Sequence, residues 1–141
     1  MKGRVNWVEN VMFVAESDSG HAIVLDGAPA GGGRNMGMRP MELMALSVGS
    51  CSSYDVVTIL KKAKQSVTAC EAEVTAERVD GTPATFDSIH LHFKITGFDL
   101  SEKHVRRAIE LSANKYCSAS IMMKNAGVKV THDFEMHEPE K

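Results

Sequence analysis

Short runs of partly alternating apolar and polar residues open the chain. Residues 3–8 and 11–16 alternate in part, and residues 21–25 form a short apolar run. Asn10 and the cluster Asp18-Ser19-Gly20 separate these runs with typical turn residues. The pattern predicts an antiparallel meander of three strands.

A different pattern follows in the next thirty residues. Residues 27–37 are mostly small, which favours a mobile connecting loop. Pro40 then suits the first position of a helix, and Glu42 places negative charge in its first turn, where the helix dipole favours it. No charged residue occurs from Leu43 to Tyr54, so we expect this helix to be buried on most sides. Its small residues would let another helix or a partner subunit approach closely.

The middle of the chain predicts a long hairpin. Residues 67–78 and 85–96 read as two strands around a turn at 80–83. One face of the second strand is apolar, and the other carries Ser88, His90, His92 and Lys94. The first strand turns Cys70 inward and its glutamates outward. We expect the acidic face to lie beside the His/Lys face.

The C-terminal third predicts a second helix and a last strand. Ser101 is a plausible N-cap, and apolar residues recur at helical spacing as far as Tyr116. A further helical turn is expected from Ser118, and a strand around residues 128–134. The element order βββ-α-ββ-α-β predicts an α+β fold rather than a doubly wound sheet. We expect residues 1–141 to form a single domain, which is a typical domain size.

Composition excludes several classes of function. Sixteen basic and eighteen acidic residues give a formal net charge of −2, without the basic stripe of a nucleic-acid-binding protein. The N-terminus lacks the apolar run of a secretory signal, and we expect no membrane-spanning segment. Three cysteines without a CxxC pair favour free thiols in a reducing compartment, hence a cytoplasmic protein.

Two of these cysteines are candidates for redox chemistry. Cys51 lies within the first helix and Cys117 at the end of the second. A thiol peroxidase needs one thiol to become a sulfenic acid and a second thiol to condense with it to a disulfide. If a helical turn begins at Ser118, its backbone N–H groups would also stabilise a Cys117 thiolate. The alternative is that both cysteines are small buried apolar residues.

Two segments around these cysteines resemble the OsmC/Ohr superfamily of thiol-dependent peroxidases. The first is Arg39-Pro40-Met41-Glu42-Leu43-Met44-Ala45-Leu46-Ser47-Val48-Gly49-Ser50-Cys51, and the second is Ser112-Ala113-Asn114-Lys115-Tyr116-Cys117-Ser118-Ala119-Ser120. The resemblance implies an OsmC-like fold of antiparallel sheets around two central helices, in an intertwined homodimer. It also implies reduction of small organic hydroperoxides, with Cys51 as peroxidatic thiol, Cys117 as resolving thiol, Glu42 as an orienting group and an external dithiol as reductant. It implies no cofactor and no metal.

Three positions depart from that family's pattern. Met41 stands where the family has its helix glutamate, and Glu42 is one step further on. The turn Ser19-Gly20-His21 lacks the arginine that the family draws from the N-terminal strands, which leaves Arg4, Arg34 and Arg39 as substitutes. Asp55, one turn after Cys51, is expected to raise the pKa of that thiol. The competing hypothesis is therefore a non-catalytic binding or redox-sensing protein of the same fold.

Two further patterns carry less weight. His90 and His92 have the spacing of a two-histidine metal site, but a solvated strand face explains them better. The four methionines of the helix start, Met36, Met38, Met41 and Met44, could line an apolar pocket for a fatty or aryl hydroperoxide. Packing in a dimer would explain them equally well.

Overall fold

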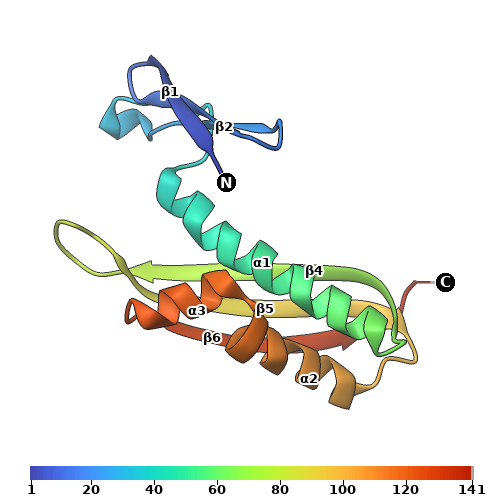
Figure 1. Cartoon of the computed structure of the whole chain (residues 1–141). Helices are drawn as coiled ribbons and strands as arrows, with labels where there is room; N and C mark the ends of the chain where they lie inside the picture. The colour runs from blue at the N-terminus through green and yellow to red at the C-terminus, as the bar shows by residue number, and fades with distance from the viewer. Residues whose placement is uncertain (141) are drawn as a thin grey trace. The chain divides into compact units, whose positions relative to one another are not determined.

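The computed structural model describes residues 1–140, which divide into two compact units (Figure 1). The N-terminal unit comprises residues 1–44, and the C-terminal unit begins at Ala45. Helix α1 (Pro40–Lys62) crosses the boundary between them.

A three-stranded antiparallel sheet forms most of the N-terminal unit. Its strands are β1 (Gly3–Glu9), β2 (Met12–Ser17) and β3 (Ala22–Leu25), in the order β1-β2-β3. This confirms the predicted meander, and Asn10 adopts the positive φ of 47° that the tight turn requires. Every residue of β1 is exposed, so this sheet has almost no core of its own.

The loop that follows β3 is held in place by Asp26. This buried carboxylate accepts hydrogen bonds from the backbone N–H groups of Gly27, Arg34 and Met36, at 2.7, 3.1 and 3.0 Å. The bond from Met36 contributes most to a lowered pKa of Asp26. A short 3₁₀ helix, η1 (Pro29–Gly31), lies within the loop. The loop that was expected to be a mobile connector is therefore held by hydrogen bonds to Asp26.

The second sheet belongs to the C-terminal unit and has the order β4-β5-β6. Strands β4 (Ser66–Arg78) and β5 (Phe86–Phe98) form the predicted long hairpin. Strand β6 (Lys129–His137) pairs with β5 in parallel, so the sheet is mixed, and the expectation of purely antiparallel sheets was wrong here. A parallel neighbour requires a crossover, which the helices between β5 and β6 provide.

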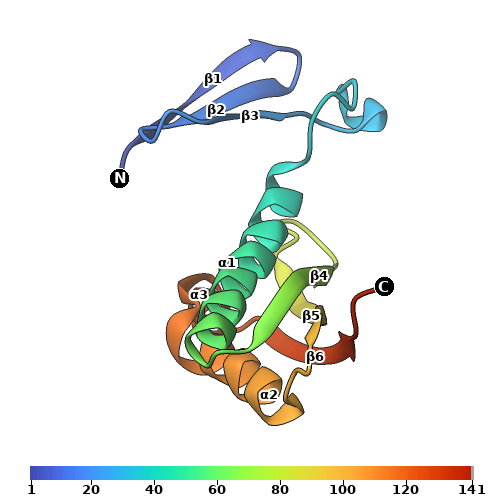
Figure 2. The ribbon, with the colours of Figure 1, turned by 90° about the vertical axis from the view of Figure 1, so that its right-hand side faces the viewer.

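Three helices cover one face of this sheet (Figure 2). They are α1, α2 (Glu102–Leu111) and α3 (Ser118–Asn125). The second predicted helix does not continue to Tyr116, because a π-helical turn, η2 (Ser112–Tyr116), separates α2 from α3. Gly49 of α1 lies against β4, where an added Cβ would come within 2.6 Å of Val74. The small residues of α1 therefore allow the sheet, as well as another helix, to pack closely against α1.

Alternation along β5 places its apolar residues in the core. Ile89, Leu91, Phe93 and Ile95 are at most 2% exposed. On the opposite face Glu73 pairs with His92 and Glu71 with Lys94 in the strand register, as predicted. Lys94 forms an ion pair with Glu73 across the strands.

By length and composition, α1 would be able to cross a membrane. Its most apolar 18-residue window has a mean hydropathy of 1.4, which corrects the expectation that no segment approaches this range. One face of the helix packs against the protein, with residues such as Val48, Val56 and Leu60 fully buried. These contacts are typical of a core helix. Only 33% of the window is buried, so the expectation of burial on most sides was wrong for the single chain.

Candidate functional site

Cys51 lies in the middle of α1 and is half-buried. Burial raises the pKa of its thiol most, and the neighbouring Cys117 sulfur and Asp55 carboxylate raise it further. The backbone N–H of Ala119, in the first turn of α3, hydrogen-bonds to Cys51 and acts in the opposite direction. The net pKa of Cys51 is raised, and the predicted influence of Asp55 is confirmed.

Cys117 is the N-cap residue of α3, which begins at Ser118 as expected from the sequence. Its sulfur accepts hydrogen bonds from the Ser120 backbone N–H at 3.4 Å and from the Ser52 hydroxyl at 3.2 Å. Complete burial raises the pKa of Cys117. Hydrogen bonds from the Ser120 hydroxyl, Ser52, the Ser120 N–H and Cys51 together outweigh this effect. The net pKa of Cys117 is lowered.

The two sulfurs and the carboxylate of Asp55 form a compact group. One ligand atom from each of Cys51, Asp55 and Cys117 lies within 4.8 Å of the other two. All three cysteines are free thiols in this structure. A disulfide has a sulfur–sulfur bond of about 2.05 Å, so joining Cys51 to Cys117 requires only a small local movement.

Three buried serines surround the group formed by Cys51, Asp55 and Cys117. Their role was not predicted from the sequence. Ser52 of α1, Ser112 of η2 and Ser120 of α3 are at most 2% exposed. The hydroxyls of Ser52 and Ser120 are 3.2 Å apart, while that of Ser112 donates to the Ser52 carbonyl oxygen and to Asp55, at 3.3 and 3.4 Å. The serines that flank both cysteines in the sequence could have indicated hydrogen-bond donors near the two sulfurs.

Glu42 is placed in the first turn of α1, within the N-terminal unit. Its carboxylate accepts a hydrogen bond from the backbone N–H of Arg39 at 2.8 Å, which caps the start of the helix. This contact gives Glu42 a structural role. Its predicted orienting role at Cys51 stays a prediction.

The three arginines considered as substitutes also belong to the N-terminal unit, and each has a partner there. Arg4 forms an ion pair with Glu16 at 2.6 Å, and Arg34 forms one with Glu9. Arg39 donates to the Asn35 side chain and to the Gly37 carbonyl oxygen, at 2.6 and 3.0 Å. Each arginine considered as a substitute for the family arginine therefore makes a contact within its own unit.

Cys70 behaves as predicted for a packing residue. It is half-buried on the inward face of β4, and burial raises the pKa of its thiol. Its hydrogen-bond partner is Ser53, outside the group formed by Cys51, Asp55 and Cys117. Cys70 therefore offers a matched control for experiments on the other two thiols.

His90 and His92 lie on the outer face of β5 beside two carboxylates of β6. Asp133 Oδ1 lies 3.1 Å from His90 Nε2 and 2.6 Å from His92 Nδ1, and Glu135 Oε2 lies 3.7 Å from His92 Nε2. The bond to Asp133 raises the pKa of His92 most. These contacts lie on a solvent-accessible strand face, the interpretation that the sequence favoured.

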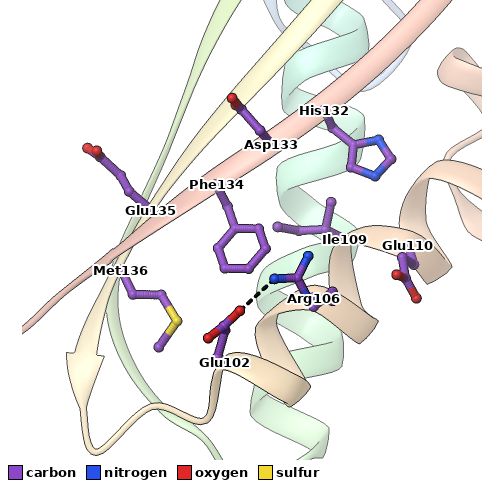
Figure 3. A pocket seen from close by; sticks show the side chains of 9 residues that line it. All are labelled: Glu102, Arg106, Ile109, Glu110, His132, Asp133, Phe134, Glu135 and Met136. Carbon is purple, nitrogen blue, oxygen red and sulfur yellow. Dashed lines mark hydrogen bonds and ion pairs between the residues drawn. The ribbon is translucent and has the colours of Figure 1, made fainter.

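The hollows outside the thiol group include one apolar hollow in the N-terminal unit and one in the C-terminal unit. The N-terminal hollow, of about 520 Å³, has an apolar lining that includes Val5, Val11, Phe13 and Leu25 but none of the four methionines. The other lies between α2 and β6 and measures about 460 Å³ (Figure 3). There Arg106 contacts Glu102 and lies 5.1 Å from the centre of the Phe134 ring. No cysteine lines either hollow.

Comparison with known proteins agrees with the fold. Residues 31–133 match the family described as OsmC-like protein. The chain belongs to the OsmC-like family. Protein YhfA of Escherichia coli is 44% identical over 136 residues, which cover 96% of this chain and 98% of YhfA.

Solved structures extend the likeness to more distant OsmC-like proteins. A hypothetical protein from Aquifex aeolicus is 28% identical with a TM-score of 0.80, and the match covers 96% of each chain. An organic hydroperoxide resistance protein from Legionella pneumophila is 18% identical with a TM-score of 0.71, over 95% of each chain. The latter comparison concerns the fold alone.

Proposed function

We propose that this OsmC-like protein is a cytoplasmic, thiol-dependent hydroperoxide reductase that uses Cys51 and Cys117 as its redox pair. The single observation that carries the proposal is the convergence of these two free thiols, with their sulfurs within 4.8 Å of one another. Family membership supports a redox or peroxide-resistance role. The substrate would be a small organic hydroperoxide, and the function would be defence against oxidative stress.

In the first step Cys51 attacks the terminal peroxide oxygen. Cys51 is the thiol that reaches solvent, whereas Cys117 is 0% exposed. The Cys51 sulfur hydrogen-bonds to Cys117, whose lowered pKa makes it the more readily ionised of the two thiols. As a thiolate, Cys117 would accept the Cys51 proton as the S–O bond forms. The peroxide O–O bond breaks, Cys51 becomes a sulfenic acid, and the alkoxide leaves as an alcohol after taking up a proton. Cys117 thus takes part of the role given to an arginine elsewhere in the family.

In the second step Cys117 attacks the sulfenic sulfur. The disulfide forms and water leaves, carrying the sulfenic oxygen and the proton of the Cys117 thiol. An external dithiol then reduces the disulfide and is itself oxidised. Overall, one hydroperoxide and one dithiol yield one alcohol, one water and one disulfide.

The exposed apolar surface supports a homodimer in which residues 1–141 form one OsmC-like domain per subunit. In the N-terminal unit Val5, Trp7 and Phe13 are 64%, 66% and 36% exposed. In the C-terminal unit Tyr54 and Met122 are 75% and 69% exposed. Such surfaces are common where a partner covers them. We expect sedimentation equilibrium to give the mass of two chains, and the mass of one chain would contradict the dimer.

The redox proposal is tested by thiol-dependent consumption of cumene hydroperoxide. We expect Cys51→Ser to abolish the activity, because the attacking sulfur is gone. Cys117→Ser should block turnover, because no disulfide can form, while Cys70→Ser should retain the wild-type rate. Equal consumption by wild type and Cys51→Ser would reject the proposal.

One observation favours a second candidate, a binding or redox-sensing protein of the same fold. The pKa of Cys51 is raised, and a raised pKa makes a thiol a slower nucleophile near neutral pH. In that case Cys51 and Cys117 would oxidise only slowly and without catalytic turnover. The rate of the wild-type protein in the same assay separates the two candidates.

A further inference from the structure

The group formed by Cys51, Asp55 and Cys117 has the composition of a metal-binding site. Cys51 and Asp55 are four residues apart on α1, so they share one face of that helix. Cys117 reaches the same point from the start of α3. One ligand atom from each lies within 4.8 Å of the others. Two sulfurs and one carboxylate oxygen suit a borderline-soft divalent cation such as Zn²⁺.

The charges of the group also favour a cation. The Cys117 sulfur and the Asp55 carboxylate both act on Cys51 as negative neighbours. Among residues 1–140, Asp55 takes part in none of the ion pairs within 4.0 Å. A divalent cation would turn the mutual repulsion of these ligands into attraction.

From this arrangement we propose that the reduced chain binds one Zn²⁺ through Cys51 Sγ, Cys117 Sγ and a carboxylate oxygen of Asp55. The proposal goes beyond peroxide reduction and does not depend on it. Binding displaces the Cys51 proton to solvent, because thiolates rather than thiols are metal ligands. Three protein ligands leave the fourth tetrahedral position to water.

The distances between the three ligand atoms permit this coordination if the atoms move slightly closer together. Zn–S bonds of about 2.3 Å in a tetrahedral site place two sulfurs about 3.8 Å apart, inside the observed limit. The surrounding serines are suitable outer partners for the ligands. Ser52 donates to Cys117 and Ser112 donates to Asp55, which would orient both toward the cation.

The test uses the full-length chain, reduced and stripped of metal under anaerobic conditions. Titration with Co²⁺ should give one equivalent of a sulfur-to-cobalt charge-transfer absorption, which Zn²⁺ then removes. A competing chromophoric chelator gives the Zn²⁺ dissociation constant. We expect Cys51→Ser and Cys117→Ser to weaken binding by more than about 100-fold, since changes to outer partners alone cost about 10–100-fold. Cys70→Ser, which removes the thiol outside the group, should bind like wild type.

Asp55→Asn separates this proposal from the redox function. The asparagine keeps the shape of the side chain and can still accept the Ser112 hydrogen bond, but it is a poor zinc ligand. We expect Zn²⁺ binding to weaken by at least about tenfold. Alkylation of Cys51 by iodoacetamide should at the same time become faster, because a negative neighbour that raises its pKa is gone.

Circular dichroism of Asp55→Asn separates the loss of a ligand from unfolding, which would also expose Cys51 and speed its alkylation. A wild-type spectrum together with weaker metal binding shows a folded variant that has lost a ligand. Wild-type affinity in Asp55→Asn, or no charge-transfer absorption in the wild-type protein, would overturn the proposal. Neither result would bear on peroxide consumption, which the cysteine variants test separately.

Discussion

The surroundings of Cys51 and Cys117 differ although both sulfurs contact the first turn of the same helix. Ala119 N–H hydrogen-bonds to Cys51 and Ser120 N–H to Cys117. The pKa of Cys51 is nevertheless raised and that of Cys117 lowered. Proximity to a helix N-terminus therefore does not by itself decide the acidity of a thiol.

The difference lies in the side chains that face each sulfur. Cys117 receives hydrogen bonds from the hydroxyls of Ser52 and Ser120, and these, together with the bonds from the Ser120 N–H and from Cys51, outweigh the cost of its complete burial. Cys51 faces a second sulfur and the Asp55 carboxylate, both of which disfavour a further negative charge. The accessible thiol is thus the weaker acid, and the buried thiol is the stronger one. This division suits a pair in which one member attacks and the other accepts its proton.

Removing the Ser52 hydroxyl is the change expected to affect this contrast most. In a Cys51→Ser, Cys70→Ser background, Cys117 is the one remaining thiol, and its ultraviolet thiolate absorbance can be followed against pH. Ser52→Ala should reduce the thiolate fraction near neutral pH by about tenfold, since a hydrogen bond to a charged group contributes about 1.5–3 kcal/mol. The folded protein should lose about 1 kcal/mol of stability.

Ser50→Ala is the matched control for this change. Ser50 lies two residues earlier on α1, is exposed, and donates to the Ser47 carbonyl oxygen at 3.2 Å. Its removal should leave the Cys117 titration unchanged. If Ser52→Ala also titrates like its parent, the hydroxyl does not hold the Cys117 thiolate, and the contrast between the two sulfurs needs another cause.

Local features of this contrast were predictable from the sequence, and features that need the fold were not. Asp55 follows Cys51 by one helical turn, so its effect on that thiol could be predicted. The position of Cys117 beside a helix N-terminus could likewise be predicted, because a helical turn was expected from Ser118. The hydrogen bond between Ser52 and Ser120 joins residues 68 positions apart, and no periodicity in the sequence indicates such a pairing.

The same division holds for the fold as a whole. Alternation in β5 predicted its buried face and the position of its His/Lys face beside the acidic face of β4, because a strand has a fixed period of two. The Glu73–Lys94 ion pair lies between these two faces. The parallel pairing of β6 with β5 depends on the path of the intervening helices and could not be derived from the strand itself. The role of Asp26 was also missed, since its three backbone donors come from a loop without periodic structure.

The smallest expected effect is the pH dependence of stability, which should have opposite signs for the two thiols. Cys117 loses its proton at lower pH in the folded chain than in the unfolded chain, so the unfolded state binds more protons in that interval. Stability should therefore rise with pH up to the ordinary value of 9.0 and be lost as pH falls through the folded pKa. Cys51 keeps its proton longer when folded. Its contribution should be complete below 9.0 and fall as pH rises above it.

Single-thiol variants isolate the two contributions. Cys51→Ser, Cys70→Ser retains Cys117, and Cys117→Ser, Cys70→Ser retains Cys51; subtracting the triple serine variant removes all other titrating groups. Urea unfolding at a series of pH values should then give two curves of opposite slope, each below about 1.4 kcal/mol per pH unit, the limit for one group. Two slopes of the same sign would mean that the sulfurs share one environment, and Cys117 would then have no advantage as the proton acceptor for Cys51.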